Sequence, residues 1–123
     1  MILFTLTPLF AVTLVPLYGY LYGYDMFEWV AFIILAGFCG MSITAGYHRL
    51  WSHKSYKAHP LLRVVYALGG ALALQNDVFS WASDHRRHHQ HVDDNDRDPY
   101  SAGRGFWFSH MGWILRDYPS GKQ

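Results

Sequence analysis

Three histidines in one short stretch carry the clearest chemical signal in the sequence. Residues 84–89 read Asp-His-Arg-Arg-His-His, so His88 and His89 follow His85 by three and four positions. On an α-helix these spacings place all three imidazoles within an arc of about 100°. Neutral imidazole is a ligand for transition metals, so three of them on one helical face predict a metal site.

A second pair of histidines lies upstream, directly after a long apolar segment. Residues 48–53 read His-Arg-Leu-Trp-Ser-His, so His48 and His53 are five positions apart. On an ideal α-helix five positions leave the second side chain about 140° around the axis, so the helix must end or distort there for both to reach one metal. Ser52 and Ser55 favour such an end, because serine competes with the helical backbone for hydrogen bonds. Ligand type alone leaves iron, zinc, copper and nickel open.

The elements that must hold these histidines divide the chain into an apolar front and a polar back. The 123 residues are 51% hydrophobic, yet before Arg49 the only charged residues are Asp25 and Glu28, and all ten Lys and Arg residues are at Arg49 or later. A net charge of +1 without a long basic run gives no support for nucleic-acid binding. The single cysteine, Cys39, allows neither an internal disulfide nor a thiolate metal cluster.

Two apolar segments predict a transmembrane hairpin. Residues 1–24 carry no charge, and residues 29–47 are nineteen uncharged residues, so each is long enough to cross a membrane as a helix. Between them, aromatic residues surround Asp25 and Glu28, as is typical of a membrane surface. Basic residues follow only the second span, so the positive-inside rule predicts that the histidine stretches lie on the cytoplasmic face.

The chain after the histidine pair is expected to remain at the membrane surface. Residues 61–74 are apolar but short for a crossing, and one crossing would separate the two histidine stretches. We therefore predict that they lie in the interface, or dip and return, and that their helix continues into residues 85–91. The acidic run 93–98 is expected to be a solvated loop, although single carboxylates in it could orient histidines. A further interfacial helix is expected over 103–115.

These features together predict an all-α membrane protein with one domain at most. Its spans at residues 1–24 and 29–47 precede a cytoplasmic and interfacial histidine region at residues 48–123. Two histidines are expected to lie outside the metal site, because His91 is about 120° away from the ligand face and His59 precedes a proline in a loop.

The two histidine stretches and their flanks resemble the membrane fatty acyl desaturases of the Δ9, stearoyl-CoA desaturase-like type. Residues 48–53 and 85–89 are similar to the first two histidine boxes of that family. Residues 75–77 (Gln-Asn-Asp) with Trp81, Ala82 and Asp84 resemble the segment between the boxes, and residues 108–113 (Phe-Ser-His-Met-Gly-Trp) resemble the segment after them. The similarity covers roughly residues 29 to 119.

The resemblance implies a non-haem di-iron enzyme of fatty acid biosynthesis that inserts a cis double bond, at Δ9, into a saturated long-chain acyl substrate. It implies two Fe²⁺ ions, O₂ as co-substrate, a small electron-transfer protein with its reductase, and a lipid membrane. The implied metal ligands are His48, His53, His85, His88 and His89. His110 matches a family position that is not a metal ligand, which implies a packing or hydrogen-bonding role. Gln75 and Trp81 are implied to line the acyl tunnel, and Asn76 and Asp84 to contact the substrate head group. An ordinary surface or histidine-orienting carboxylate is an equal reading of Asp84.

The sequence also departs from the family. The family completes its site with a third His-x-x-His-His box and a further ligand beyond two more spans, and the 123 residues contain neither. We therefore expect a fragment that by itself neither holds two irons nor desaturates a substrate. Ser83 and the pair Arg116 and Asp117 stand where CoA-using relatives have basic residues, which leaves CoA, a carrier protein and a lipid open as the acyl carrier.

Two other functions are alternatives to desaturation. A histidine-box hydroxylase of alkanes or sterols would differ in box spacing and usually include Glu, which the Arg-Leu-Trp-Ser spacer of residues 49–52 argues against. A membrane metal transporter would place histidines or carboxylates inside its spans, and residues 1–24 and 29–47 contain none.

Overall fold

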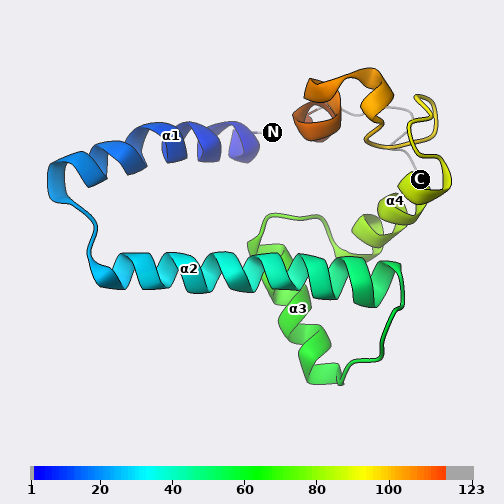
Figure 1. Ribbon diagram of the computed structural model, residues 1–123, viewed down its shortest axis with the longest axis horizontal. Helices are drawn as coiled ribbons and strands as arrows, with labels where there is room; N and C mark the ends of the chain where they lie inside the picture. The colour runs from blue at the N-terminus through cyan, green and yellow to red at the C-terminus, as the bar shows by residue number, and fades with distance from the viewer. Residues whose placement is uncertain (1, 116–123) are drawn as a thin grey trace. The chain divides into compact units, whose positions relative to one another are not determined.

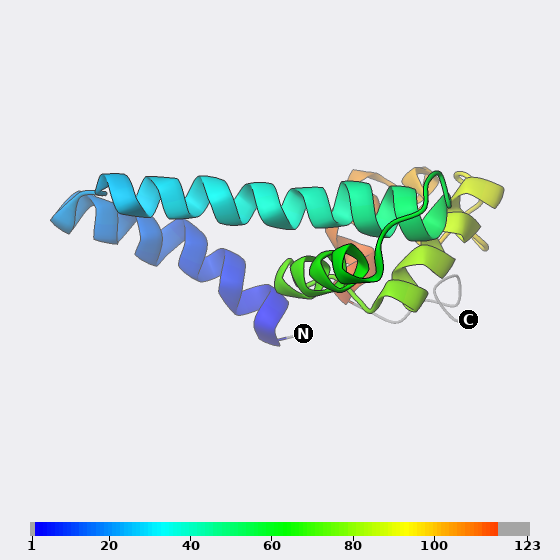
Figure 2. The ribbon, with the colours of Figure 1, turned by 90° about the horizontal axis from the view of Figure 1, so that it is seen from below.

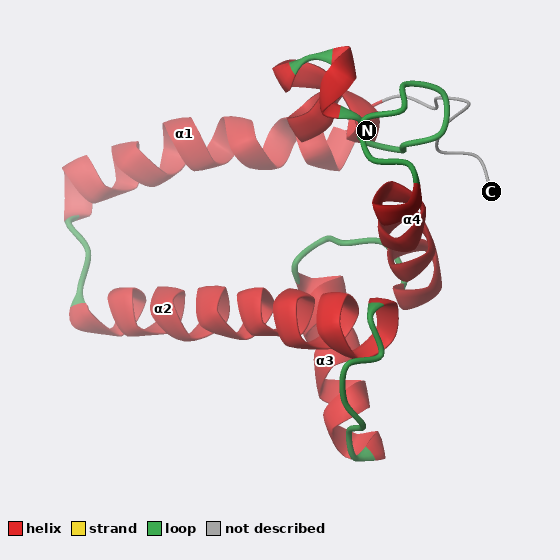
Figure 3. Ribbon diagram, turned by 45° about the vertical axis from the view of Figure 1, so that its right-hand side comes forward, coloured by secondary structure: helices red, strands yellow, loops and turns green. Residues whose placement is uncertain are grey.

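The computed structural model describes residues 2–115 and shows helices and loops, with no strand in this range (Figures 1 and 3). The chain divides into two compact units, Met1–Leu35 and Ala36–Gln123, which are described in turn. The prediction of an all-α protein is confirmed for the described residues.

The first unit is a helical hairpin with a polar turn. It contains α1 (Ile2–Tyr22) and the start of α2 (Met26–Met41). At the turn the Asp25 carboxylate accepts a hydrogen bond from the Glu28 backbone N–H at 2.8 Å, and the Glu28 carboxylate accepts one from the Asp25 N–H at 2.9 Å. This reciprocal pairing satisfies two backbone donors at the start of α2 and fixes where the second helix begins.

Both long helices have the length and composition of membrane spans. α1 has 21 residues, and the continuous helix Met26–Ser52 has 27. Large apolar side chains along both helices are exposed to the surroundings, an arrangement that water disfavours and a bilayer satisfies. The predicted pair of spanning helices is thus confirmed in length and composition, and the second helix begins before and ends after the expected 29–47.

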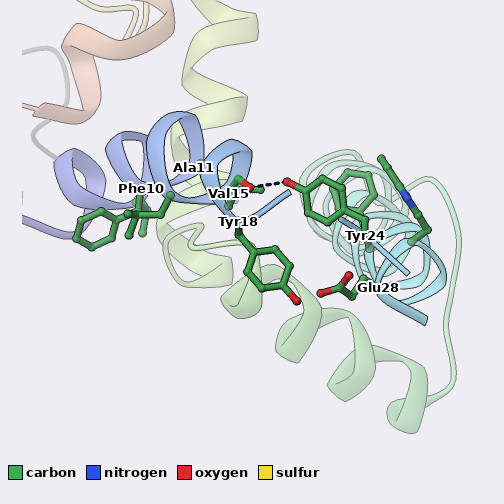
Figure 4. A pocket seen from close by; sticks show the side chains of 10 residues that line it. Phe10, Ala11, Val15, Tyr18, Tyr24 and Glu28 are labelled. Atoms are coloured by element: carbon green, nitrogen blue, oxygen red, sulfur yellow. Dashed lines mark hydrogen bonds between the residues drawn. The ribbon is translucent and has the colours of Figure 1, made fainter. Parts of the chain in front are cut away.

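An apolar cavity of about 830 Å³ lies within the first unit, between the facing sides of its two helices. Figure 4 shows the side chains of Tyr18 and Glu28 pointing toward one another at its polar end, and the Tyr24 hydroxyl donating to the Val15 carbonyl. Glu28 is the only lining residue whose side chain is a common metal ligand. The cavity therefore contributes nothing to a histidine site.

In the second unit the long helix changes from α to π geometry. α2 passes without a break into η1 (Ser42–Ser52), where backbone hydrogen bonds join residues five positions apart. The last of this pattern is the bond from His53 N–H to the His48 carbonyl, at 3.0 Å. Lys54 then adopts a left-handed conformation with φ of 51°, which ends the helix. The distortion expected between His48 and His53 is therefore present.

Helix α3 (Pro60–Leu72) crosses the C-terminal half of this long helix (Figures 1 and 2). Glycine permits the close approach, because a Cβ atom at Gly69 would overlap Ser42 and one at Gly70 would overlap the Tyr47 ring. Tyr47 is only 2% exposed at this crossing. Other side chains of α3 remain exposed and apolar, as its predicted interfacial position requires: Leu61, Val64, Leu68 and Leu72.

We expect Gly70→Ala to destabilise the second unit by about 1–3 kcal/mol, because the added methyl group must displace the packed Tyr47 ring. The measurement is the unfolding midpoint in detergent, followed by circular dichroism. Gly37→Ala is the matched control, since nothing lies within 4 Å of a Cβ at that position. Equal midpoints for the two variants would contradict the close crossing.

Helix α4 (Val78–Gln90) is separate from α3, so the expectation of one continuous helix is wrong. Leu74, with φ of 57°, prevents the helix from continuing. Asp77 starts the new helix by accepting hydrogen bonds from the backbone N–H groups of Phe79 (2.9 Å) and Ser80 (3.1 Å). Hydrogen bonds from Ser80, foremost that of its hydroxyl, lower the pKa of Asp77. Because the two helices are separate, α4 can take a direction different from that of α3 and still pack against η1.

The segment after α4 is less helical than expected. A 3₁₀ turn, η2 (Ala102–Arg104), ends at Gly105, whose φ of 96° is incompatible with a continuing helix. Helical structure resumes at residue 106 and includes η3 (Phe108–Gly112) and α5 (Trp113–Leu115). The helix predicted over 103–115 therefore begins three residues late. Arg116 and Asp117, which bear on the acyl carrier, lie outside the described residues.

Candidate metal centre

Four histidines from both predicted stretches converge where η1 meets α4. One ligand nitrogen from each lies within 4.8 Å of the others: His48, His53, His85 and His89. The Nε2 atom of His53 is 3.1 Å from that of His48 and 3.2 Å from that of His85, and the Nε2 atoms of His85 and His89 are 3.0 Å apart. Nitrogens that share a metal at about 2.0–2.1 Å are roughly 3 Å apart, so these donors fit one transition-metal ion.

Two different helical rules produce this convergence. His85 and His89 are four positions apart on α4 and therefore share a face of an ordinary α-helix. His48 and His53 are five positions apart, a spacing that the π geometry of η1 accommodates. Its hydrogen bonds join residues i and i+5, so side chains five residues apart lie on the same side of the helix. The π segment is thus the element that adapts the first stretch to a metal.

The environment of His85 keeps its imidazole neutral. Burial first, and then the neighbouring histidines, lower the pKa of His85 to about 4. The ring of Trp81 stacks on it, with the centroids 4.9 Å apart and the planes 23° from parallel. Because the pKa is lowered, the second ring proton, which would compete with a metal, binds only as the pH falls toward 4.

His88 is the predicted ligand that the structure does not place in this four-histidine cluster. Its Nδ1 atom lies 3.0 and 2.9 Å from the two carboxylate oxygens of Asp98, whose side chain is fully buried. The acidic run is a turn-rich loop as expected, but Asp98 is not solvated, and the sequence analysis did not single it out. No helical periodicity links residues ten positions apart across a loop, so spacing offered no signal for this pair.

Two of the predicted substrate residues contact one another. The Trp81 indole N–H donates to the Gln75 side-chain oxygen at 2.9 Å. The same indole packs edge-on against the buried Tyr47 ring, with centroids 5.8 Å apart, and stacks on His85. Trp81 therefore forms a wall directly beside the four-histidine cluster, while the tunnel-lining role of the pair stays a prediction.

The two predicted head-group residues occupy different surroundings. Asn76 is exposed in the loop before α4, whereas Asp84 is half-buried on α4. Burial raises the pKa of Tyr100 well above its ordinary value, and the carboxylates of Asp84 and then Asp98 act in the same direction. Asp84 therefore lies near Tyr100, whose ring packs against His88, and the head-group assignment stays a prediction.

The other histidines have local roles in the structure. His59 caps α3, because its Nδ1 accepts a hydrogen bond from the Leu61 N–H at 3.3 Å, and His91 ends α4 as its C-terminal cap. The ring of His110 stacks on Phe106, with centroids 4.1 Å apart. None of the three is part of the four-histidine cluster.

The fold and the site define a helical membrane protein with a candidate histidine metal centre. Residues 27–121 match the family model described as Fatty acid desaturase. The chain is 46% identical over 127 residues to stearoyl-CoA desaturase of Bos taurus (100% of this chain, 33% of the relative) and 54% identical over 87 residues to Delta(9)-fatty-acid desaturase fat-7 of Caenorhabditis elegans (70% and 25%). The chain belongs to the fatty acid desaturase family, which confirms the resemblance drawn from the histidine stretches. It spans about a third or less of the length of these relatives.

Proposed function

We propose that this chain supplies two histidine boxes to an O₂-dependent acyl desaturase that inserts a cis Δ9 double bond into a saturated long-chain acyl-CoA. The observation that carries the proposal is the convergence of four imidazole Nε2 atoms from both boxes, in a member of the fatty acid desaturase family. The relatives, a stearoyl-CoA desaturase and a Delta(9)-fatty-acid desaturase, support the proposed substrate and the proposed position of the double bond.

The proposed reaction converts two neighbouring CH₂ groups into CH=CH. O₂ accepts four electrons, two from the broken C–H bonds and two from a small electron-transfer protein and its reductase. With the two substrate hydrogens and two further protons, it leaves as two molecules of water. The four-histidine cluster would hold iron in part, and iron bound there would activate O₂ for the removal of hydrogen from an unactivated methylene.

The residues of the chain prepare this site in two ways. The neutral ring of His85 offers its lone pair without first losing a proton. The hydrogen bond between Trp81 and Gln75 satisfies the indole N–H, so the aromatic wall beside the histidines can exclude water without leaving that donor unpaired. Such a wall suits an acyl chain that passes the metal.

The test uses a chimaera in which this chain replaces the matching segment of the Bos taurus relative. The chimaera is supplied with stearoyl-CoA, O₂ and the electron-transfer proteins. We expect a cis Δ9 product, and its loss when His89→Ala is added to the exchanged segment. Hydroxylated acyl product from a correctly inserted chimaera would favour a histidine-box hydroxylase instead. Metal uptake into sealed vesicles without any acyl product would favour a transporter. Stearoyl groups on a carrier protein or a lipid, supplied in parallel, distinguish the three acyl carriers.

We propose further that both histidine boxes lie on the cytoplasmic face. In a Cys39→Ser background, single cysteines at Ser55 and Arg97 should label from the cytoplasmic side, and one at Tyr22 should label from the other side. The reason is that basic residues follow only the second span. Labelling of Ser55 and Arg97 from opposite sides would mean that α3 crosses the bilayer, and the proposed orientation would be wrong.

A further inference from the structure

A buried carboxylate holds the fifth histidine of the two boxes. Asp98 has no exposed surface, and both of its oxygens lie within 3.0 Å of His88 Nδ1. The same carboxylate accepts hydrogen bonds from the backbone N–H groups of Asp93 at 2.9 Å and Tyr100 at 3.1 Å. Asp98 is therefore held by its own loop as well as by its contact with the histidine.

The loop around Asp98 has further bonds that hold it in one conformation. The Asp93 carboxylate accepts from the Ala102 N–H at 2.9 Å, and the Ser101 hydroxyl donates to the Asn95 side-chain oxygen at 2.8 Å. Ser101, like Asp98, has no exposed surface. Such a loop presents the carboxylate in a set position, so little ordering remains to be done when a metal binds.

The chemistry of this contact determines which nitrogen of His88 can bind a metal. An ionised carboxylate only accepts hydrogen bonds, so Nδ1 carries the proton and Nε2 keeps the lone pair. Carboxylates commonly orient metal-binding histidines in this way. The Tyr100 ring, with its centroid 4.7 Å from that of His88, packs against the imidazole and limits its rotation further.

The position of His88 separates it from the other four histidines. Its ring centroid is 6.3 Å from that of His85 and 5.6 Å from that of His89, and it is not part of the cluster whose nitrogens lie within 4.8 Å of each other. With Nδ1 bound to Asp98, only Nε2 remains as a ligand atom.

We propose that Asp98 is a positioning residue that fixes the tautomer of His88 and so commits its Nε2 atom to a second metal, distinct from the ion that the four-histidine cluster holds. The second metal rests on the proposed di-iron function, whereas the tautomer and its cause do not. The tests therefore separate the two.

The first test reads the tautomer in the metal-free, 123-residue chain with ¹⁵N-labelled histidine. Two-bond proton–nitrogen correlations should show His88 as the Nδ1–H tautomer, and Asp98→Ala should convert it to a mixture or to the Nε2–H form. Asp96→Ala, which removes an exposed carboxylate of the same loop, should leave the His88 signals unchanged. A predominant Nε2–H tautomer in the unmodified chain would overturn the proposal, whatever the enzyme does.

The second test separates the two metals with Co²⁺, whose visible absorption reports histidine ligation. The 123-residue chain should bind its first Co²⁺ equally well with and without Asp98→Ala or His88→Ala, because neither residue belongs to the four-histidine cluster. In the Bos taurus chimaera, Asp98→Ala should weaken the second metal about 10–100-fold. The double variant Asp98→Ala/His88→Ala should bind the second metal no more weakly than His88→Ala alone, because Asp98 acts through the His88 ring.

Two outcomes of the cobalt experiment would contradict the proposal. If Asp98→Ala removed the first Co²⁺ from the 123-residue chain, the residue would support the loop or the helix as a whole and not His88 in particular. If the double variant lost much more metal than His88→Ala, Asp98 would act on another ligand. A chimaera that binds two metals but does not desaturate would count against the proposed function and leave the role of Asp98 intact.

Discussion

Replacing His85 by Ala is expected to abolish metal binding at the four-histidine cluster. His85 is central to it, because its Nε2 lies 3.2 Å from that of His53 and 3.0 Å from that of His89. Changes to residues that only orient a ligand typically cost about 10–100-fold in affinity, so loss of a direct ligand should cost at least that much. The measurements are Co²⁺ titration of the 123-residue chain and iron content with double-bond formation in the chimaera.

The control variants for this prediction are His91→Ala and His59→Ala, which lie at helix ends away from the cluster. Both should bind Co²⁺ as the unmodified chain does, and both should keep substantial activity in the chimaera. If His91→Ala lost metal as completely as His85→Ala, the ligand set assigned to α4 would be wrong.

Insertion of one alanine between Arg49 and Leu50 is expected to have a comparable effect without removing any histidine. The insertion makes the histidine spacing six, and neither the α nor the π hydrogen-bond pattern returns a side chain to the same side after six residues. His53 should then point away from His48, and the Co²⁺ affinity of the chain should fall at least as far as in His85→Ala. Circular dichroism would show that the helices are retained.

An alanine inserted between Lys57 and Ala58 is the control, because that connection precedes the cap of α3 and lies outside η1. It should leave metal binding unchanged. Tight Co²⁺ binding by the Arg49–Leu50 insertion would mean that the five-residue spacing, and the π geometry that accommodates it, are not required for the site.

Local spacing was enough to predict much of this protein. The two charge-free segments, residues 1–24 and 29–47, predicted two helices of spanning length, because a bilayer demands about 20 apolar residues in succession. The i, i+4 spacing of His85 and His89 predicted a shared face, because helical geometry depends only on sequence separation. The five-residue spacing of His48 and His53 predicted a distortion, although it did not say that the distortion would be a π-helix.

Tertiary structure decided what depends on residues distant in the sequence. The separation of α4 from α3, and the packing of both on η1, bring the two histidine stretches to one place, and the glycines of α3 are informative only once Ser42 and Tyr47 are known to face them. His88 shares its helical face with His85, but a buried carboxylate ten residues later holds it apart from the cluster. An acidic run reads as solvated because charge prefers water. Only the folded structure compensates the burial of Asp98, with backbone N–H donors from Asp93 and Tyr100 and a contact with the His88 ring.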